Sequence, residues 1–518
     1  YTRAGESSIP GLIVIDEIKS TGRSLDYYDS QANTVHWAQA ACYAFMYASL
    51  NDLREIGVQL TYCHLDSGET REYRRTFNLA DLVQFFEDTV SPYLKWAETI
   101  IQWRRLRDDS ITALQFPFDG YRQGQREMAV AVYRTISAGG QLIVQAATGI
   151  GKTMAAIFPA VKAVAEEHIA GIFYLTARTT GRAVAEKAIE ALRGGGLRLK
   201  SLTLTAKDKI CFNPEKSCNG DECEYARGYY DRLRESLPLV FGQDAITREV
   251  IESTARTYRL CPFELSLALS LYADCIICDY NYAFDPRVYL RRFFYEGNDD
   301  YTFLIDEGHN LVERSREMFS AEIRKQPFLK LRRGLRGSLP RIHRGMGKVN
   351  TWLVKARKSC ESTENREERR AEKQQPEGLY PVLRRFLKLT EDWLALNRKT
   401  DFRDSLLDLY FTVVGFMRVA ETYDQSYVTC YEKMGKDLRI KLFCIDPSGQ
   451  LREALRRCRS VVFFSATMTP AEYFKKIFGC RESATHLILP SPFPAENLGT
   501  FICDRISTLY RQRDQTIE

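Results

Sequence analysis

Short apolar runs alternate along this chain with segments in which apolar residues recur at helical spacing. One run, Leu142–Val144, leads through a glycine-rich turn into the apolar segment 154–157, and a second run, Phe303–Ile305, ends at two acids. The segments 380–387 and 393–396 space their apolar residues three and four apart, as amphipathic helices do. We therefore predict an α/β protein in which strands and helices alternate, with added helical material before residue 446.

The turn between the first strand and its helix has the composition of a phosphate-binding loop. Backbone N–H groups at a helix N-terminus attract phosphate oxygens, and glycines allow the close approach. Lys152 would reach the β and γ oxygens of a nucleotide, and the Thr153 hydroxyl would bind Mg²⁺. The predicted nucleotide contacts in this loop are Thr148, Gly149, Gly151, Lys152 and Thr153.

The second strand ends in Asp306 and Glu307, two acids at the carboxyl end of an apolar run. Asp306 could hold Mg²⁺, and Glu307 could orient a hydrolytic water. Either motif alone is common as an ordinary turn or strand end. Both in this order indicate hydrolysis of a nucleoside triphosphate, with Lys152, Asp306 and Glu307 as catalytic residues.

Composition and charge narrow the class of protein. Lysine and arginine total 73 against 67 acids, so the net charge alone does not identify a nucleic-acid partner. No uncharged apolar stretch reaches the roughly 20 residues of a membrane span, so we expect no membrane partner and a cytoplasmic protein, or a nuclear one in a eukaryote. The chain begins at Tyr1, and we expect a fragment with several domains.

A basic run lies between residues 324 and 358, which hold twelve Lys or Arg residues and no Asp or Glu. Such a run could follow the phosphates of a nucleic acid. It could equally be the solvated face of a helical insertion.

Four of the fourteen cysteines form a separate group. Cys211, Cys218 and Cys223 lie in a polar loop, and Cys261 comes directly before a proline. Thiolates in irregular backbone suit a site with four sulfur ligands, which could hold either zinc or a [4Fe–4S] cluster. The pair Cys275 and Cys278 lies in an apolar strand and is predicted to be buried without a metal.

The order of these motifs resembles that of the iron–sulfur helicases of superfamily two, the XPD/DinG-like group. The resemblance begins near Phe116 and runs to the end of the chain. It rests on seven segments in the family's order: 116–125, 174–179, 261–263, 279–282, 306–309 with Gly308 in the place of alanine, 464–467 and 491–494.

The resemblance implies a RecA-like parallel-sheet motor that uses ATP and Mg²⁺ and acts on DNA with single-stranded regions. Gln125 would read adenine, and Cys211, Cys218, Cys223 and Cys261 would bind a [4Fe–4S] cluster. The implied divisions are motor domain 1 at 108–199, 269–312 and 446–490, the iron–sulfur domain at 200–268, a helical arch at 313–445 and the start of motor domain 2 at 491–518.

Residues 1–107 contain a pattern that the motor does not need. Glu17 and Lys19 are two apart near the end of an apolar strand and so share one face, and a helix with Gln39 and Tyr43 follows. This pairing resembles the RecB-like branch of the PD-(D/E)XK nucleases, which implies a Mg²⁺ or Mn²⁺ site that includes Glu17, with Glu17 and Lys19 as catalytic residues. That family also needs an upstream aspartate, and we expect it to lie outside this chain.

Taken together, the sequence predicts an ATP-dependent DNA helicase or translocase fused to a partial α/β nuclease-like domain, acting in DNA repair or processing. Two alternatives remain open. One is a non-catalytic DNA-binding scaffold with a degenerate motor and nuclease. The other is a zinc-ribbon ATPase that acts on RNA or protein.

Overall fold

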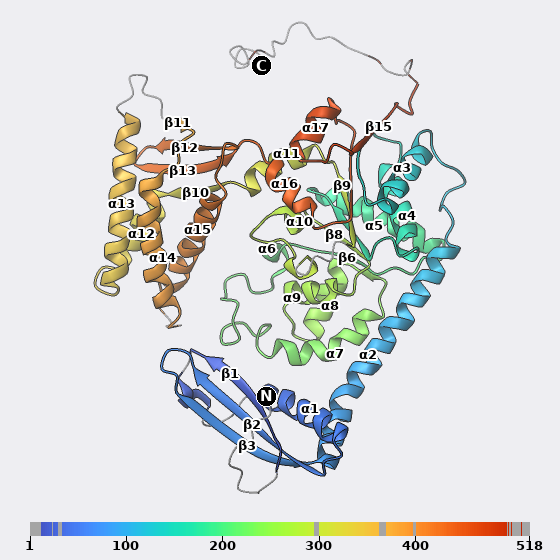
Figure 1. The fold of residues 1–518 in the computed structure, drawn as a ribbon. Helices are drawn as coiled ribbons and strands as arrows, with labels where there is room; N and C mark the ends of the chain where they lie inside the picture. Colours follow the sequence, from blue (N-terminus) through green and yellow to red (C-terminus); the bar gives the residue numbers. More distant parts are fainter. Residues whose placement is uncertain are drawn as a thin grey trace. The chain divides into compact units, whose positions relative to one another are not determined.

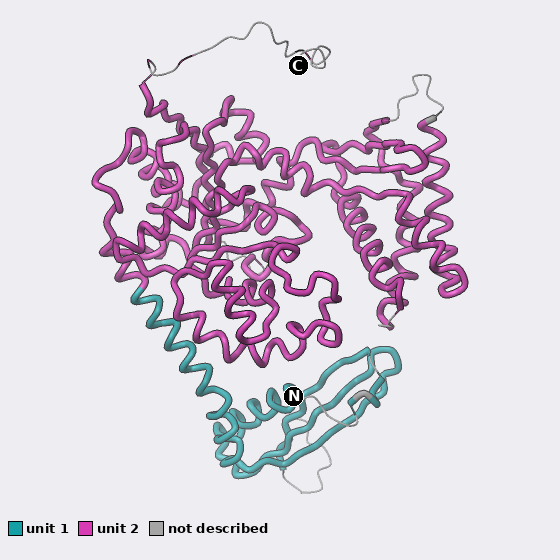
Figure 2. The backbone as a smooth tube through the Cα atoms, turned by 180° about the vertical axis from the view of Figure 1, so that it is seen from behind, with its two compact units in different colours: residues 1–106 teal, residues 107–518 magenta. Residues whose placement is uncertain are grey.

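The computed structural model describes residues 12–22, 24–28, 34–294, 300–361, 369–396, 400–494, 496, 499 and 509. The chain divides into two compact units, Tyr1–Leu106 and Arg107–Glu518, which Figure 2 colours separately. The expected start of a second motor domain at 491–518 lies mostly outside the described residues. None of the described helices is long and apolar enough to cross a membrane.

Unit 1 is a three-stranded sheet with a helix packed on it. Its strands, in the order β1-β2-β3, are β1 (Val14–Thr21), β2 (Glu55–His64) and β3 (Thr70–Asn78). The short helix η1 (Leu25–Tyr28) and α1 (Thr34–Leu50) connect β1 to the parallel β2, and β2 turns antiparallel into β3. Alanines 40, 44 and 48 are fully buried, which lets α1 lie close to the sheet. The helix α2 (Leu79–Ala113) begins in this unit.

Unit 2 is built on eight parallel strands in the order β15-β4-β14-β9-β5-β8-β6-β7 (Figure 1). A parallel sheet needs crossover connections that cover both faces, so its inner strands β5, β8, β9 and β14 are almost wholly buried. The strands are β4 (Gln141–Ala146), β5 (Gly171–Leu175), β6 (Ser201–Thr203), β7 (Ala245–Ile246), β8 (Cys275–Cys278), β9 (Tyr301–Asp306), β14 (Ser460–Ser465) and β15 (Thr485–Leu489).

Alternate residues of the strands enter two separate cores. On β14, Phe463 joins one core, and Val462 and Phe464 join the other. The second core is closed by α3 (Gln125–Ser137), α4 (Lys152–Ala165) and α5 (Thr179–Gly194). The first is continuous with α10 (Asn281–Phe284), η2 (Arg291–Phe293), α11 (Asn310–Met318), α16 (Ser448–Leu455) and α17 (Ala471–Ile477). The α/β class with a RecA-like parallel sheet is confirmed.

Two insertions interrupt this sheet. The first contains the cysteine loop and the helices α6 (Lys207–Ile210), α7 (Tyr229–Phe241), α8 (Arg248–Thr257) and α9 (Pro262–Ser270). Cys275 and Cys278 lie instead on the central strand β8 and are fully buried, as the apolar run predicted.

The second insertion combines helices with a sheet. Four strands in the order β10-β13-β12-β11 pair antiparallel, so the strands that open and close the insertion lie side by side. We expected a helical arch, and the sheet was not predicted. Its elements are β10 (Ala321–Arg324), α12 (Lys325–Gly334), α13 (Pro340–Glu361), β11 (Arg369–Glu372), η3 (Glu377–Leu379), α14 (Tyr380–Leu394), α15 (Arg403–Glu421), β12 (Tyr427–Met434) and β13 (Asp437–Cys444).

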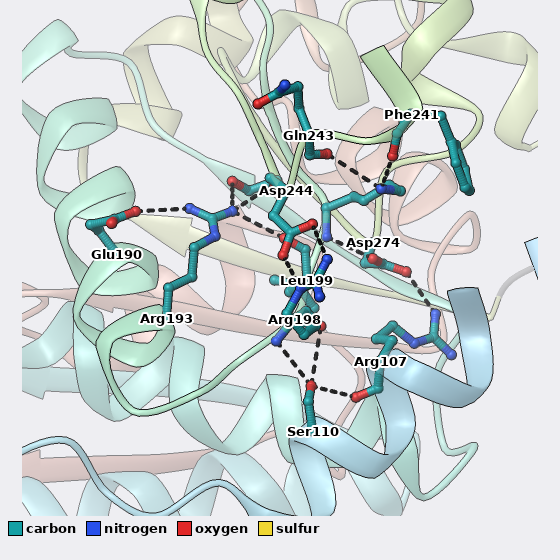
Figure 3. A network of polar contacts seen from close by, with 12 residues as sticks. Arg107, Ser110, Glu190, Arg193, Arg198, Leu199, Phe241, Gln243, Asp244 and Asp274 are labelled. Carbon is teal, nitrogen blue, oxygen red and sulfur yellow. Dashed lines mark hydrogen bonds and ion pairs between the residues drawn. The ribbon is translucent and has the colours of Figure 1, made fainter. Parts of the chain in front are cut away.

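A partly buried polar network holds the end of α2 to the edge of the large sheet (Figure 3). The Arg107 guanidinium lies 2.6 Å from the Asp274 carboxylate, which also accepts a bond from the Lys200 backbone N–H at 2.8 Å. Arg198 pairs with Asp244 at 2.5 Å, and its N–H donates to the Ser110 hydroxyl. The charged groups in this network are paired, as burial requires.

Candidate ATP site

The predicted strand–turn–helix at the phosphate loop is confirmed. The strand β4 ends at Ala146, the turn covers residues 147–151, and α4 begins at Lys152. Gly149 (φ 91°) and Gly151 (φ 86°) adopt left-handed backbone angles that favour glycine. The amino end of α4 therefore opens directly from a turn that only glycines accommodate without strain, which is the geometry of an anion cradle.

Arg122 and Gln125, at the start of α3, hydrogen-bond to the backbone of the phosphate loop. Gln125 is 3% exposed, accepts a bond from the Arg122 N–H at 3.0 Å and donates to the Gly151 carbonyl at 3.2 Å. A Cβ on Gly151 would collide with the Gln125 amide. The Arg122 guanidinium donates to the Gly149 carbonyl at 2.6 Å. Gln125 thus fixes the phosphate loop and keeps one further N–H and one lone pair for a ligand.

Aromatic rings gather just before this segment. Phe116 stacks on Tyr121 with ring centroids 3.9 Å apart, and Phe118 meets Phe116 edge-on at 5.6 Å. Phe118 and Tyr121 remain exposed. Flat apolar surface beside Gln125 suits a planar base, although nothing in the geometry selects adenine.

Lys152 and the two acids of β9 lie in one electrostatic neighbourhood. Burial lowers the pKa of Lys152, and the Glu307 and Asp306 carboxylates oppose that shift. Burial raises the pKa of Asp306 to about 6, helped by Glu307 and opposed by the Tyr174 hydroxyl and the Lys152 ammonium. These mutual effects require the groups to be close, so the fold brings the loop lysine and both acids together as predicted from the sequence.

Thr153 belongs to the same neighbourhood through Tyr174. Tyr174 is fully buried on β5, and burial together with the Asp306 charge raises its pKa well above the usual range, while Thr153 acts in the opposite direction. Thr153 and Asp306 therefore both lie close to the Tyr174 side chain. An oxygen-rich pair of this kind suits Mg²⁺.

Glu307 adopts an unusual backbone conformation. Its φ is 48°, in the left-handed region that non-glycine residues rarely enter. Its N–H donates to the Asp306 carboxylate at 2.9 Å, and the buried Tyr280 hydroxyl donates to the Asp306 and Glu307 carbonyls. Strained residues of this kind gather at functional sites. Sequence reasoning placed Tyr280 only in a connecting segment and missed this role.

Ser465, at the end of β14, joins the acids to the following strand. Its hydroxyl donates to the Glu307 carboxylate at 3.1 Å and lies 2.6 Å from His309 Nδ1. His309 also lies 3.3 Å from the Glu307 carboxylate. A change in the charge or position of Glu307 therefore alters the hydrogen bonds of Ser465, whose hydroxyl also accepts a bond from the Thr467 N–H.

Gly308 stands where the helicases that this chain resembles have alanine, and the structure gives a steric reason for glycine. A Cβ at this position would lie 2.5 Å from Met468 Cε and 3.5 Å from Phe463 Cβ. Real Cβ atoms do not approach that closely, so alanine here would displace the Met468 side chain.

The four loop cysteines do not form a metal site by geometry alone: no group of three His, Cys, Asp or Glu side chains in the described ranges converges tightly enough to hold an ion. The Lys207 ammonium nevertheless interacts with three of the thiols. The pKa of Lys207 is raised chiefly by Cys218, with further effects of Cys261 and Cys211. Cys223 is buried and accepts a long contact of 3.8 Å from the Asn213 amide.

In unit 1 the predicted nuclease residues are in contact with one another. The Lys19 ammonium lies 2.6 Å from the Glu17 carboxylate and donates to the Gln39 side chain at 3.0 Å. Gln39 in turn donates to the Tyr43 hydroxyl at 3.3 Å. His36 was not predicted as part of this group. Burial and the Lys19 charge lower the pKa of His36, and the Glu17 charge opposes this shift.

Comparisons with known proteins agree with the helicase elements of unit 2. A family model described as DEAD/DEAH box helicase matches residues 124–217, and a second, described as DEAD_2, matches residues 198–328. Together the two matches cover residues 124–328, which contain the phosphate loop and both acids.

Individual relatives match over shorter stretches. A Fanconi anemia group J protein homolog from Gallus gallus is 26% identical over 120 residues, covering 23% of this chain and 9% of the relative. A regulator of telomere elongation helicase 1 homolog from Aedes aegypti is 26% identical over 139 residues, covering 24% of this chain and 14% of the relative. A solved structure titled Truncated XPD has a TM-score of 0.47 at 17% identity and covers 70% of this chain and 98% of that one.

Proposed function

We propose that unit 2 is the ATP-driven motor of an XPD-like DNA helicase or translocase. The observation that carries this proposal is the contact of Ser465 with both Glu307 and His309, which links the acids of a nucleotide site to the next strand of the sheet. A motor needs such a link, because hydrolysis must change the position of a DNA-contacting segment. The matched relatives, three of them described as helicase homologs, support the same interpretation.

The residues have separate tasks in this proposal. The loop N–H groups and Lys152 neutralise the β- and γ-phosphates, and Thr153 and Asp306 ligate Mg²⁺. Glu307 orients the attacking water, and its carboxylate is held by a hydrogen bond from the Ser465 hydroxyl. Gln125 would read adenine with its remaining N–H and lone pair while it holds the phosphate loop.

The cysteine loop would hold a [4Fe–4S] cluster through Cys211, Cys218, Cys223 and Cys261. The fit rests on Lys207, because four thiolates and a cluster carry net negative charge and an ammonium among three of the sulfurs offsets it. When bound, the cluster supplies a covalent crosslink between a loop that has little apolar content and the start of α9. Zinc on the same thiolates is the alternative.

The ATPase reaction tests the motor. Lys152→Ala should bind ATP poorly, because the cation that faces the phosphates is gone. Glu307→Gln keeps the shape of the side chain and should bind ATP yet hydrolyse it at least about 100-fold more slowly, as loss of a positioning or charge-stabilising group commonly costs. Fluorescent-nucleotide binding and phosphate release, each with and without single-stranded DNA, separate the two defects.

Lys187→Ala is the matched control, since Lys187 is exposed on α5 and lies outside the site. It should behave as the parent protein does, with hydrolysis stimulated by single-stranded DNA. ATP hydrolysis that is independent of DNA and unchanged by both site variants would show that the site has been misassigned.

A second activity is favoured by the contacts in unit 1. The run from Glu17 to Lys19, Gln39 and Tyr43 joins a strand and a helix in the arrangement that the nuclease resemblance implies. In this proposal Glu17 shares a Mg²⁺ or Mn²⁺ ion with a further carboxylate, and Lys19 stabilises charge on the attacked phosphate or its water. The whole chain would then process DNA, as repair requires.

A further inference from the structure

The solvent face of α13 has an unusual composition. Apart from Pro340 at its first position, seven described side chains on this 22-residue helix are exposed, and each is basic or carries a hydroxyl. They are Arg341, Arg344, Lys348, Thr351, Lys355, Lys358 and Ser359. The opposite side packs into the insertion through Ile342, Met346, Val349 and Leu353.

The five cations form a narrow line along the helix. At 3.6 residues per turn they fall within an arc of about 100°, with Thr351 in the same arc. A rise of 1.5 Å per residue makes the line about 25 Å long, with gaps of about 4.5 to 10.5 Å between successive charges. We call this line, residues 341, 344, 348, 355 and 358, the α13 stripe.

The described side chains give the stripe no acidic counterpart. Within the described ranges, no side chain of the stripe forms an ion pair, and residues 324–358 contain no Asp or Glu. An ordinary solvated helix mixes both signs of charge on its exposed face, as α14 does with Arg384, Arg385, Lys388, Glu391 and Asp392. Like charges this close repel one another, so the stripe costs stability unless a polyanion binds it.

The shape of the stripe selects the kind of polyanion. A membrane-binding helix needs large apolar side chains beside its cations, and the exposed face of α13 has none. A line of single charges suits instead a linear chain of phosphates, which releases its counterions when cations replace them. In Figure 1, α13 lies at the edge of the second insertion farthest from the parallel sheet.

We propose that the α13 stripe binds the phosphate backbone of single-stranded DNA at a place separate from the motor's own DNA path. This proposal rests on the proposed function, since it is the motor that brings a DNA strand to the protein. The contact carries no base readout, because lysine and arginine ends alone meet the phosphates. It would hold the strand that enters or leaves the motor and so slow its dissociation.

The test compares two sets of three substitutions that remove equal charge from the same insertion. Lys348→Gln, Lys355→Gln and Lys358→Gln remove most of the stripe, and Arg384→Gln, Arg385→Gln and Lys388→Gln on α14 are the matched control. Fluorescence anisotropy measures the binding of labelled oligo(dT) of about 10 and about 40 nucleotides over a range of salt concentrations. Vesicles with anionic lipid form a separate arm.

The stripe variant should bind the long oligonucleotide about tenfold more weakly than the parent at moderate salt. The slope of log K against log salt should fall by about 2, since each lost phosphate contact on a single strand removes about 0.7. Binding of the short oligonucleotide, basal ATP hydrolysis and the α14 control should remain unchanged.

Three results would overturn the proposal. Unchanged binding of the long strand would make the stripe a solvated face. Equal losses for both lengths, or for the α14 control, would make its charge a general attraction rather than a contact. Loss of vesicle binding instead of DNA binding would assign the stripe to a membrane surface. Failure of the proposed motor would appear differently, as ATP hydrolysis that DNA does not stimulate in the parent protein.

Discussion

At the scale of single residues, Lys200 carries a deeply buried charge in unit 2. Its side chain is fully buried, donates to the Phe241 and Gln243 carbonyls, and lies 4.2 Å from the centre of the Phe241 ring. Burial lowers the pKa of Lys200 to about 8, against the opposing effect of Asp244 and Asp274. The folded protein therefore holds this proton less tightly than the unfolded chain does.

We expect this difference to make stability depend on pH. Below pH 8 both states carry the proton, so folding bears the full cost of the buried charge. Between about pH 8 and 10.5 only the unfolded chain keeps it, so the contribution of Lys200 to the unfolding free energy rises with pH, by up to roughly 3 kcal/mol for about 2.5 units at 1.36 kcal/mol each.

Urea unfolding at several pH values checks this expectation. The unfolding free energy of the parent minus that of Lys200→Met should rise from pH 8 to 10. For the exposed control Lys187→Met, the same subtraction should give a constant value. A difference that stays flat or falls over that window would show that Lys200 is not the group responsible.

The residues of the site fall into two groups: those that a local sequence motif identifies, and those whose role depends on contacts with residues far away in the sequence. The loop from Thr148 to Thr153 could be predicted because its glycines, lysine and threonine are consecutive, and a local pattern specifies a local turn. Tyr280 could not, because its hydroxyl donates to carbonyls 26 and 27 positions away, at the end of β9, which β5 separates from β8 in the sheet. Contacts of this kind depend on strand order, which a single sequence does not encode locally.

At the scale of elements, the second insertion illustrates a signal that was present and overlooked. In β13, Leu438, Ile440, Leu442 and Cys444 are buried and alternate with more exposed residues, which is the period of a half-buried strand. Charged residues at three of the four alternate positions complete this strand pattern, but the prediction for this insertion followed the helical spacing of 380–387 and 393–396 alone. The helices were therefore predicted and the sheet that joins them was not.

The cysteine loop is the element whose prediction is most directly measurable. Anaerobically prepared protein should contain about four irons and matching sulfide per chain, with visible absorption typical of a Cys₄ cluster. Cys218→Ser should lose most of the iron and the absorption, because one of four ligands is removed. Cys430→Ser, in β12 of the second insertion, should keep both.

Stoichiometric zinc without iron or sulfide in the same preparation would contradict the cluster and favour the zinc-ribbon alternative. Iron that survives unchanged in the Cys218 variant would remove Cys218 from the ligand set.

At the scale of the whole molecule, the two units have separate hydrophobic cores, one from Leu25 to Leu82 and the others within 107–518. Each candidate site lies within one unit. Their chemistry should therefore be separable by substitution.

Lys19→Ala should abolish Mg²⁺- or Mn²⁺-dependent DNA cleavage and leave ATP hydrolysis intact. Gln39→Ala should weaken cleavage less, since Gln39 positions Lys19 rather than meeting the phosphate. Lys152→Ala should stop ATP hydrolysis and leave metal-dependent cutting of single strands measurable. Gel assays on single-stranded, duplex and flapped DNA, with ATPase assays in parallel, measure both activities.

Lys95→Ala, an exposed residue of α2, is the control and should retain both activities. If the parent protein cuts none of these substrates with either metal, unit 1 is an inert remnant of a nuclease and the second proposed activity falls.

The close packing of Met468 against Gly308 should affect which residues related sequences carry at these two positions. The two positions are 160 residues apart, yet the methyl end of one fills the space that a Cβ on the other would need. A substitution at one of these positions therefore limits which residues fit at the other. In relatives that carry alanine in place of Gly308, the residue that follows the Ser-Ala-Thr segment should be shorter or differently shaped than methionine, so that the two columns of an alignment change as a pair.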